Sequence, residues 1–166
     1  MQIGGIKMNT SIIHVAIWVL AGMILMGLIV WFTMPLLMLV KHKSNLSYDK
    51  TVTALSETLQ KKQDWHVLTV NDFQKSTKDF VTLERVGSVS ICNPRYVSQI
   101  LADDKNRGVT AFMPLEYGVY EDKKGQVFIT QLNVGLLGKM FGGTISVVMG
   151  MAGKDLREVV ESVSAK

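Results

Sequence analysis

The sequence predicts an α+β domain, with a small antiparallel sheet of four to five strands covered by helices, preceded by one N-terminal transmembrane helix. Two observations lead to this prediction. A long uncharged apolar stretch precedes Lys41, and beyond residue 44 the apolar residues follow helical and strand periods in turn. The resulting order of helix, two strands, helix, two strands and helix is typical of an antiparallel sheet with packed helices.

Length and composition limit the architecture further. The chain has 166 residues, of which 48% are hydrophobic and 19% charged, with a formal net charge of +4. This length holds one small domain and one additional element. We therefore assign residues 1–43 to a tail, the transmembrane helix and an interfacial stretch, and residues 44–166 to the domain. The single cysteine excludes a disulfide framework and a zinc site made of several cysteines.

The apolar stretch is long enough to cross a bilayer. No charged residue lies between Lys7 and Lys41, whereas a membrane-spanning helix needs about 20 apolar residues. Pro35 can kink or end a helix, so we expect the span near residues 11–33 and an interfacial stretch at 34–40. Aromatic residues before the proline suit the membrane interface. The residues assigned to the anchor are Ile12, Trp18, Leu25, Trp31, Phe32 and Pro35.

A cleaved signal peptide is the alternative for this stretch. Its apolar region has about 7–15 residues and precedes a cleavage site of small residues. The run here is about twice as long and no such site follows it, which favours an uncleaved anchor. We expect a single-pass bacterial protein of the cytoplasmic (inner) membrane that contacts lipid through residues 11–40. Lysines flank both ends of the stretch, so orientation is weakly determined, with the periplasmic side slightly favoured for the domain.

The first half of the domain begins with a predicted helix. Asp49 can cap a helix over residues 50–62, whose apolar residues lie on one face. Residues 65–70 and 88–92 have the β-branched and alternating composition of strands. The intervening residues 72–85 fit a turn, a short helix or a strand.

The second half contains a helix start with two recognisable residues. Asn93 is a good N-cap and Pro94 a good first helical residue, so a helix is predicted from here towards Gly108. Strands over 109–121 and 126–133 follow, joined by a tight turn, with Pro114 at an edge or a bulge. The apolar, glycine-rich residues 135–152 fit either a buried helix or a contact with the membrane or a partner. An amphipathic helix ends the chain.

Several runs of residues carry a family resemblance in their order and spacing. They are Ser47 to Thr51, Trp65 after the first domain helix, ICNPRY at 91–96, ILADD at 100–104, MPLEYGVYED at 113–122 and a strand ending in Asn133. Together they resemble the bacterial and archaeal family called domain of unknown function 302, over about residues 44–133. The resemblance implies a small α+β domain with a four- to five-stranded antiparallel sheet, and homodimers, but no established reaction. Some members carry a cysteine where this chain has Leu115, which weakens the interpretation as a two-cysteine metal site.

The candidate site residues gather around Cys92. This thiol directly precedes the predicted helix start, where the helix field can lower its pKa, although a small buried residue fits the same position. Cys92 and His66 are metal-ligand candidates if their strands adjoin, with methionines as further soft ligands for copper(I) or haem iron. The residues assigned to ligand or partner binding are Cys92, Asn93, Arg95, Met113 and Glu116. No catalytic residue and no cofactor is assigned.

Three function classes follow from this pattern. The first is a membrane-anchored, non-enzymatic binding or accessory module, as a subunit of a membrane-protein complex or a homodimer. The alternative is a redox, metal or haem-handling protein that uses Cys92 with His66 or methionines. A hydrolase comes last because the domain offers one cysteine, one histidine after residue 44 and scattered carboxylates. Nucleic acid is not an expected partner, because without the lysines that flank the anchor the basic and acidic residues nearly balance.

Overall fold

The structure, a computed structural model, describes residues 10–164 in two compact units. The first unit ends at Leu37 and the second begins at Met38. The domain therefore starts a few residues earlier than the boundary at residue 44 that the sequence suggested. The reason is a strand directly after the first helix, whose hydrogen bonds belong to the sheet.

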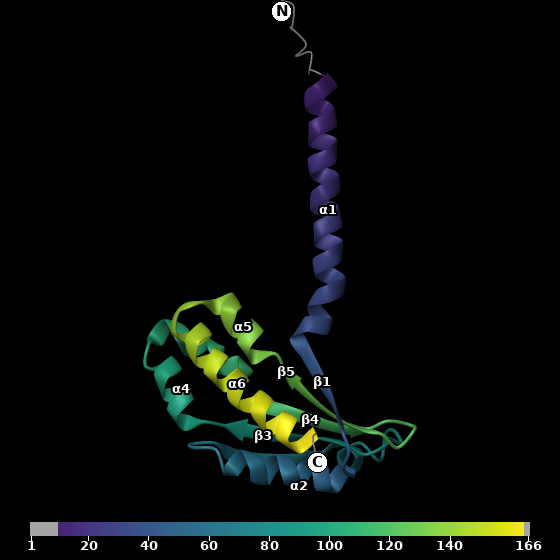
Figure 1. Ribbon diagram of the computed structural model, residues 1–166, viewed down its shortest axis with the longest axis vertical. Coiled ribbons are helices and arrows are strands. Elements are labelled where there is room, and N and C mark those ends of the chain that lie inside the picture. The colour runs from purple at the N-terminus through teal and green to yellow at the C-terminus, as the bar shows by residue number, and fades with distance from the viewer. Residues whose placement is uncertain (1–9, 165–166) are drawn as a thin grey trace, which may run out of the picture. The chain divides into compact units, whose positions relative to one another are not determined.

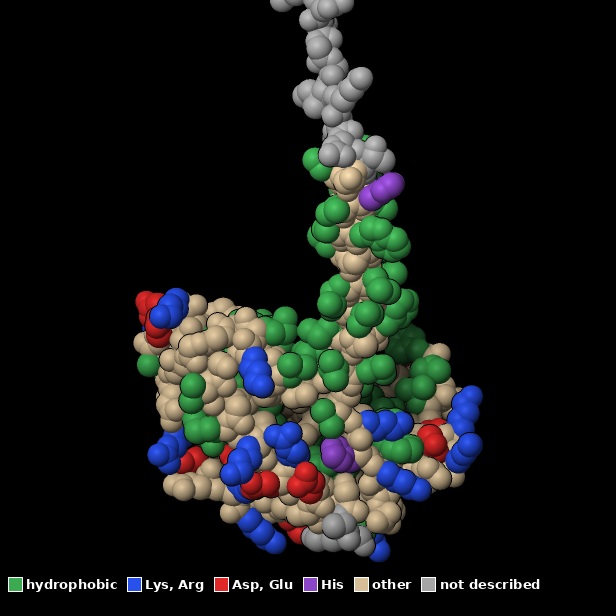
Figure 2. Space-filling model, turned by 45° about the horizontal axis from the view of Figure 1, so that its top comes forward, with side chains coloured by type: hydrophobic (Ala, Val, Ile, Leu, Met, Phe, Trp, Pro, Cys, Tyr) green, Lys and Arg blue, Asp and Glu red, His purple; other side chains and the backbone are tan. Residues whose placement is uncertain are grey.

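The first unit is the long apolar helix α1, Thr10–Met38. Its stretch Ser11–Met38 is long and apolar enough to cross a membrane. Hydrophobic side chains cover it on the face in view in Figure 2. At 1.5 Å per residue its 29 residues extend about 43 Å, more than the roughly 30 Å of a hydrocarbon core. The helix continues through Pro35 to Met38, so the expected helix end near residue 33 is wrong, whereas the interfacial position of residues 34–40 stays a prediction. A proline inside an apolar helix loses one backbone hydrogen bond, which such helices tolerate.

A single five-stranded antiparallel sheet organises the domain (Figure 1). The spatial order of its strands is β1-β5-β4-β3-β2, and every neighbouring pair is antiparallel. The strands are β1 (Leu39–Ser44), β2 (His66–Asp72), β3 (Val86–Cys92), β4 (Leu115–Glu121) and β5 (Val127–Leu132). The α+β class, the antiparallel sheet and the strand number are therefore as predicted.

The edge strand β1 was missed by the sequence interpretation. Its residues alternate between the two faces, with Val40, His42 and Ser44 directed inward and Lys41 and Lys43 outward. Because two of the inward residues are polar, the sequence lacks the alternation of apolar and polar residues that is typical of a half-buried strand. Because β1 follows α1 without a linker, the sheet begins at the residue after the apolar helix.

Within residues 38–164, six further helical elements complete the domain. They are α2 (Tyr48–Gln60), α3 (Phe73–Ser76), α4 (Pro94–Leu101), the 3-10 helix η1 (Asp104–Phe112), α5 (Val134–Phe141) and α6 (Gly143–Ser164). Asn93 caps α4 as expected, since its side chain accepts a hydrogen bond from the backbone N–H of Tyr96 at 3.2 Å. The α4 helix is shorter than predicted and ends at Leu101.

The expected strand over residues 109–121 is only half correct. Residues up to Phe112 belong to η1, and β4 begins at Leu115, after a cis bond between Met113 and Pro114. Val109 is buried in the core from η1, so the apolar residues that resembled a strand are buried by helical turns. Tertiary burial here outweighs the local β preference.

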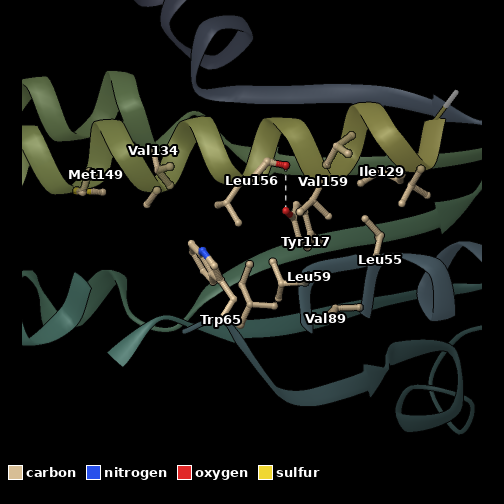
Figure 3. Close-up of a cluster of buried hydrophobic side chains, with 14 of the residues drawn as sticks. Leu55, Leu59, Trp65, Val89, Tyr117, Ile129, Val134, Met149, Leu156 and Val159 are labelled. Carbon is tan, nitrogen blue, oxygen red and sulfur yellow. Dashed lines mark hydrogen bonds between the residues drawn. The ribbon is translucent and has the colours of Figure 1, made fainter. Parts of the chain in front are cut away.

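The core lies between one face of the sheet and the helices α2 and α6 (Figure 3). Side chains of the central strands, such as Val89, Tyr117 and Ile129, point toward Leu59 of α2 and Leu156 of α6. The buried Tyr117 hydroxyl donates a hydrogen bond to the carbonyl oxygen of Leu156 at 3.0 Å. Full burial of an aliphatic or aromatic side chain contributes about 1.5–3 kcal/mol, so this layer dominates the stability of the domain.

The opposite face of the sheet is mainly polar. Residues that alternate with the core residues point to this face, and they include Lys41, Lys43, Ser88, Ser90, Glu116, Tyr120, Phe128 and Thr130. Lys41 lies over the ring of Phe128, with its ammonium nitrogen 3.8 Å from the ring centroid. Lysine, arginine, aspartate and glutamate side chains are interspersed on the domain surface in view in Figure 2.

The glycine-rich segment forms the hairpin of α5 and α6. Gly142 and Gly143 both have positive φ, at 69° and 52°, and make the turn between the helices. Gly138 lets α5 approach α6 closely, because an added Cβ would lie 2.6 Å from the Cβ of Met149. Residues 135–152 are therefore partly core and partly surface, so the buried-helix interpretation holds for one face of the hairpin, and contact of the exposed face with a membrane or a partner stays a prediction.

We predict that Tyr117→Phe lowers the free energy of unfolding by about 0.5–1.5 kcal/mol, the usual net value of one hydrogen bond. The matched control is Tyr120→Phe, which removes the same hydroxyl from the polar face. Urea unfolding of the full chain, followed by circular dichroism, measures both. Equal stabilities of the two variants would contradict the role of the Tyr117 hydroxyl.

The same variant tests a pH dependence. Burial raises the pKa of Tyr117 far above its ordinary value, whereas in the unfolded chain tyrosine ionises near pH 10. The unfolded state therefore loses a proton first, and the stability that Tyr117 contributes should decline as the pH rises above about 10. Tyr117→Phe should show a shallower decline over this range than the wild-type chain.

Candidate functional site

Three of the residues assigned from sequence meet where β3 ends and α4 begins. Cys92 is the last residue of β3, Asn93 is the N-cap of α4 and Arg95 lies in its first turn. The Asn93 amide also donates to the carbonyl oxygen of Gln63 at 3.3 Å, which holds the loop before β2 against this junction. Asn93 therefore connects this end of the sheet both to α4 and to the loop before β2.

An apolar cavity of about 50 Å³ lies behind the junction. Cys92, Asn93 and Met113 contribute to its wall, so three of the five predicted binding residues come together here. Trp65 and Tyr96 supply its aromatic wall, with ring centroids 6.0 Å apart in an edge-to-face arrangement. The remaining wall consists of Ile91, Val97, Ile100, Val109, Phe112, Pro114, Leu115, Met149 and Ala152.

An open, charged groove adjoins the cavity. It has a volume of about 380 Å³ and carries both charge signs. Arg95 lies in the groove, with its guanidinium 3.7 Å from the carboxylate of Asp64. The groove is lined by Lys62, Gln63, Asp64, Asn93, Arg95, Tyr96, Gln99, Met151 and Asp155. Asn93 and Tyr96 contribute to both the cavity and the groove, so these two residues separate an apolar space from a polar one.

Asp155 of α6 organises this boundary and was missed by the sequence interpretation. One of its oxygens accepts hydrogen bonds from the Trp65 indole N–H and the Tyr96 hydroxyl, each at 3.0 Å. Its other oxygen lies 3.9 Å from the ammonium of Lys62. The sequence did contain a signal for this residue, which is a carboxylate next to the buried stripe of an amphipathic helix. Such a group needs polar partners.

Burial determines the protonation of the two titratable groups in the cavity wall. It raises the pKa of the Cys92 thiol, whereas the sequence suggested that the helix field would lower it. It also raises the pKa of Tyr96, and the hydrogen bond to Asp155 adds to this effect. At neutral pH Cys92 is therefore a thiol, and Tyr96 remains a hydrogen-bond donor.

The proposed metal pair is adjacent in the sheet. His66 is the register partner of Cys92 on the neighbouring antiparallel strand, so the strands adjoin as that interpretation required. The His66 side chain is exposed and Cys92 is half-buried. Within residues 10–164, no three His, Cys, Asp or Glu side chains gather closely enough to hold a metal ion. A metal at this pair would need Met113 or an external ligand to complete its coordination.

Glu116 lies apart from the cavity and the groove. It is on the polar face of β4, where its carboxylate accepts a hydrogen bond from the Ser90 hydroxyl at 2.7 Å. Asn71 donates to Ser88 at 3.1 Å in the same cluster. Glu116 borders a different hollow with Gln131 and Leu132, so the structure does not join it to the other four predicted residues.

Comparison with known proteins adds the family. Residues 40–163 match the family described as Domain of unknown function DUF302. The chain belongs to the DUF302 family. The match covers the domain and leaves out α1, which lies before its first residue.

A solved structure of this family shows the same fold. The crystal structure of an uncharacterized conserved DUF302 protein from Bacillus stearothermophilus superposes with a TM-score of 0.67 and 19% sequence identity. The alignment covers 76% of this chain and 98% of that one. No similar sequence was found among curated proteins. The DUF302 comparison therefore gives the fold, and the function has to be argued from the site.

We predict that Cys92 alkylates with iodoacetamide at neutral pH several-fold more slowly than an exposed cysteine. The thiolate is the reactive form, and burial both raises the thiol pKa and restricts access. The matched reference is Ser98→Cys in a Cys92→Ala background, because residue 98 is exposed on the same helix, α4. The alkylation rate measured by mass spectrometry should be lower for Cys92 than for the cysteine introduced at residue 98. Faster alkylation of Cys92 would indicate an activated thiol.

Proposed function

We propose that this DUF302 protein is a binding module anchored in the cytoplasmic membrane by α1, and that its domain binds a small amphiphilic ligand. One observation carries the ligand part of the proposal. Asn93 and Tyr96 stand between an apolar cavity and a charged groove, so one molecule can contact both. Binding sites of this kind combine an apolar lining with a few fixed polar groups.

The anchoring part depends on the physical properties of α1. Each Leu, Ile, Phe or Val contributes about −0.3 to −0.6 kcal/mol to membrane insertion at the helix centre, and α1 consists largely of such residues. Large apolar side chains along it are exposed, including Trp18 at 76% and Leu36 at 79%. A bilayer would remove this surface from water.

The dimensions of the cavity limit the ligand. A volume of about 50 Å³ exceeds the roughly 10–15 Å³ that one water needs, yet it accepts only a few heavy atoms. A short alkyl or thioether group fits the space between Met113 and Met149, whose sulfurs are polarizable. The polar part of the ligand would face Lys62 and Arg95, or Asp64, in the groove.

The chemistry at the junction favours binding over catalysis. The only thiol has a raised pKa, which opposes its use as a nucleophile. The hydroxyl of Tyr96 already donates to Asp155 and so has a structural partner. We therefore assign these groups to shaping and closing the pocket.

A metal-handling function is the second candidate, supported by the register pairing of His66 with Cys92. Thiol and imidazole are suitable ligands for copper(I), and Met113 offers a thioether nearby in the cavity wall. Equal copper content in purified wild-type and Cys92→Ser chains would reject this candidate.

We predict that small amphiphiles shift the methionine methyl resonances of the cavity. The full chain in lipid nanodiscs, labelled with ¹³C at the methionine methyl groups, is titrated with short-chain amines, carboxylic acids and thioethers. Met113 and Met149 line the cavity, so their resonances should move in a saturable manner. Met26 in α1 is the internal reference and should remain unchanged.

Two variants separate the cavity from the groove. Ala152→Ile fills the cavity and should abolish the saturable shift. Gln99→Ala alters only the exposed groove and should weaken binding while the fold persists. If every probe moves Met113, Met149 and Met26 alike, the cavity is not a binding site and the proposal fails.

A further inference from the structure

Four large apolar side chains are exposed on η1 and on the hairpin of α5 and α6. They are Phe112 of η1 (40% exposed), Met140 and Phe141 at the end of α5 (64% and 46%) and Val147 of α6 (65%). The rings of Phe112 and Phe141 are in contact, with centroids 5.7 Å apart. The turn at Gly142 and Gly143 brings the end of α5 next to the start of α6. We call these four side chains the apolar tip.

The charges of the surrounding segment suit an anionic surface. Residues 133–153 contain no aspartate or glutamate, and their one charged residue, Lys139, is exposed directly beside Met140. The acidic residues at the start of η1 are paired with cations, Asp103 with Lys105 and Asp104 with Arg107. Exposed apolar side chains with an adjacent cation are typical of segments that lie in a lipid interface.

The chain connection places the start of α5 beside the end of α1. The backbone N–H of Asn133 donates to the carbonyl oxygen of Met38 at 2.8 Å, and Leu132 is the register partner of Leu39. The eight residues of α5 extend about 12 Å, so Met140 and Phe141 at its end lie at a distance of that order from Met38. β1 starts at the residue after α1, so no linker separates the domain from the anchor.

We propose that the apolar tip, with Lys139, contacts the anionic lipid surface of the membrane in which α1 is anchored. This inference rests on the anchoring part of the proposed function. The tip is too small for a stable protein interface, which buries about 800 Å² on each partner. A symmetric contact between two copies would also bring the two Lys139 side chains toward each other, whereas anionic headgroups complement them.

Spin labels on the full chain in nanodiscs of phosphatidylcholine and phosphatidylglycerol test the contact. Single cysteines are introduced in a Cys92→Ala background at Met140→Cys and Val147→Cys. Relaxation by oxygen, which concentrates in the bilayer, is compared with relaxation by a water-soluble nickel complex. Leu68→Cys is the matched control, because Leu68 is an equally apolar exposed residue (57%) on the edge strand β2. Leu25→Cys reports the position of α1.

The proposal expects spin labels at residues 140 and 147 to be relaxed more by oxygen than by the nickel complex. The label at residue 68 should remain accessible to the nickel complex. Lys139→Gln should reduce the excess relaxation by oxygen, and so should removal of phosphatidylglycerol. If residues 140 and 147 resemble residue 68 while residue 25 lies in the bilayer, the tip contact is overturned and the anchor stands. Accessibility of residue 25 to nickel overturns both. Spin–spin broadening at residue 147 would show a second copy on the tip and would also overturn the proposal.

Discussion

The carboxylate of Asp155 is the interaction on which the arrangement of this domain depends. It joins α6 to the indole of Trp65 before β2, to the hydroxyl of Tyr96 in α4 and, at longer range, to Lys62 after α2. These elements are distant in sequence, and apolar packing by itself is non-directional. Hydrogen bonds to a charged acceptor are directional and about twice as strong as neutral ones, so they fix the helices in one register over the sheet. The same contacts build the wall between the apolar cavity and the charged groove, which is why fold and candidate site share their key residues.

Much of the fold could be predicted from the sequence because local physics decided it. The presence of α1 follows from its uncharged apolar run, although its end at Met38 does not, and the start of α4 follows from the cap at Asn93 and the proline after it. Prediction failed where tertiary contacts outweighed local preference. The inward face of β1 carries the polar residues His42 and Ser44, so the strand is defined by its pairing with β5 and not by an apolar pattern. The apolar residues around Val109 resembled a strand but are buried by a 3-10 helix.

The candidate site was predictable in part for the same reason. Cys92, Asn93 and Arg95 are neighbours in sequence, so the recognisable helix start located all three at once. The cavity joins them to Met113, yet Glu116, only three residues further, points to the polar face of β4 because successive strand residues alternate. Asp155 lies about 60 positions after Tyr96, so its place beside a buried helix stripe indicates a need for polar partners but does not identify Tyr96 as one of them. Long-range pairing of this kind requires the structure.

The most direct test of this account is a double-mutant cycle between Tyr96→Phe and Asp155→Ala in the full chain, measured by urea unfolding. If the hydrogen bond from Tyr96 to Asp155 fixes α4 against α6, the two changes should be coupled by about 0.5–3 kcal/mol. Val52→Ala on the half-buried face of α2, combined with Tyr96→Phe, provides an additive reference. Strict additivity of Tyr96→Phe and Asp155→Ala would contradict the central role of this carboxylate.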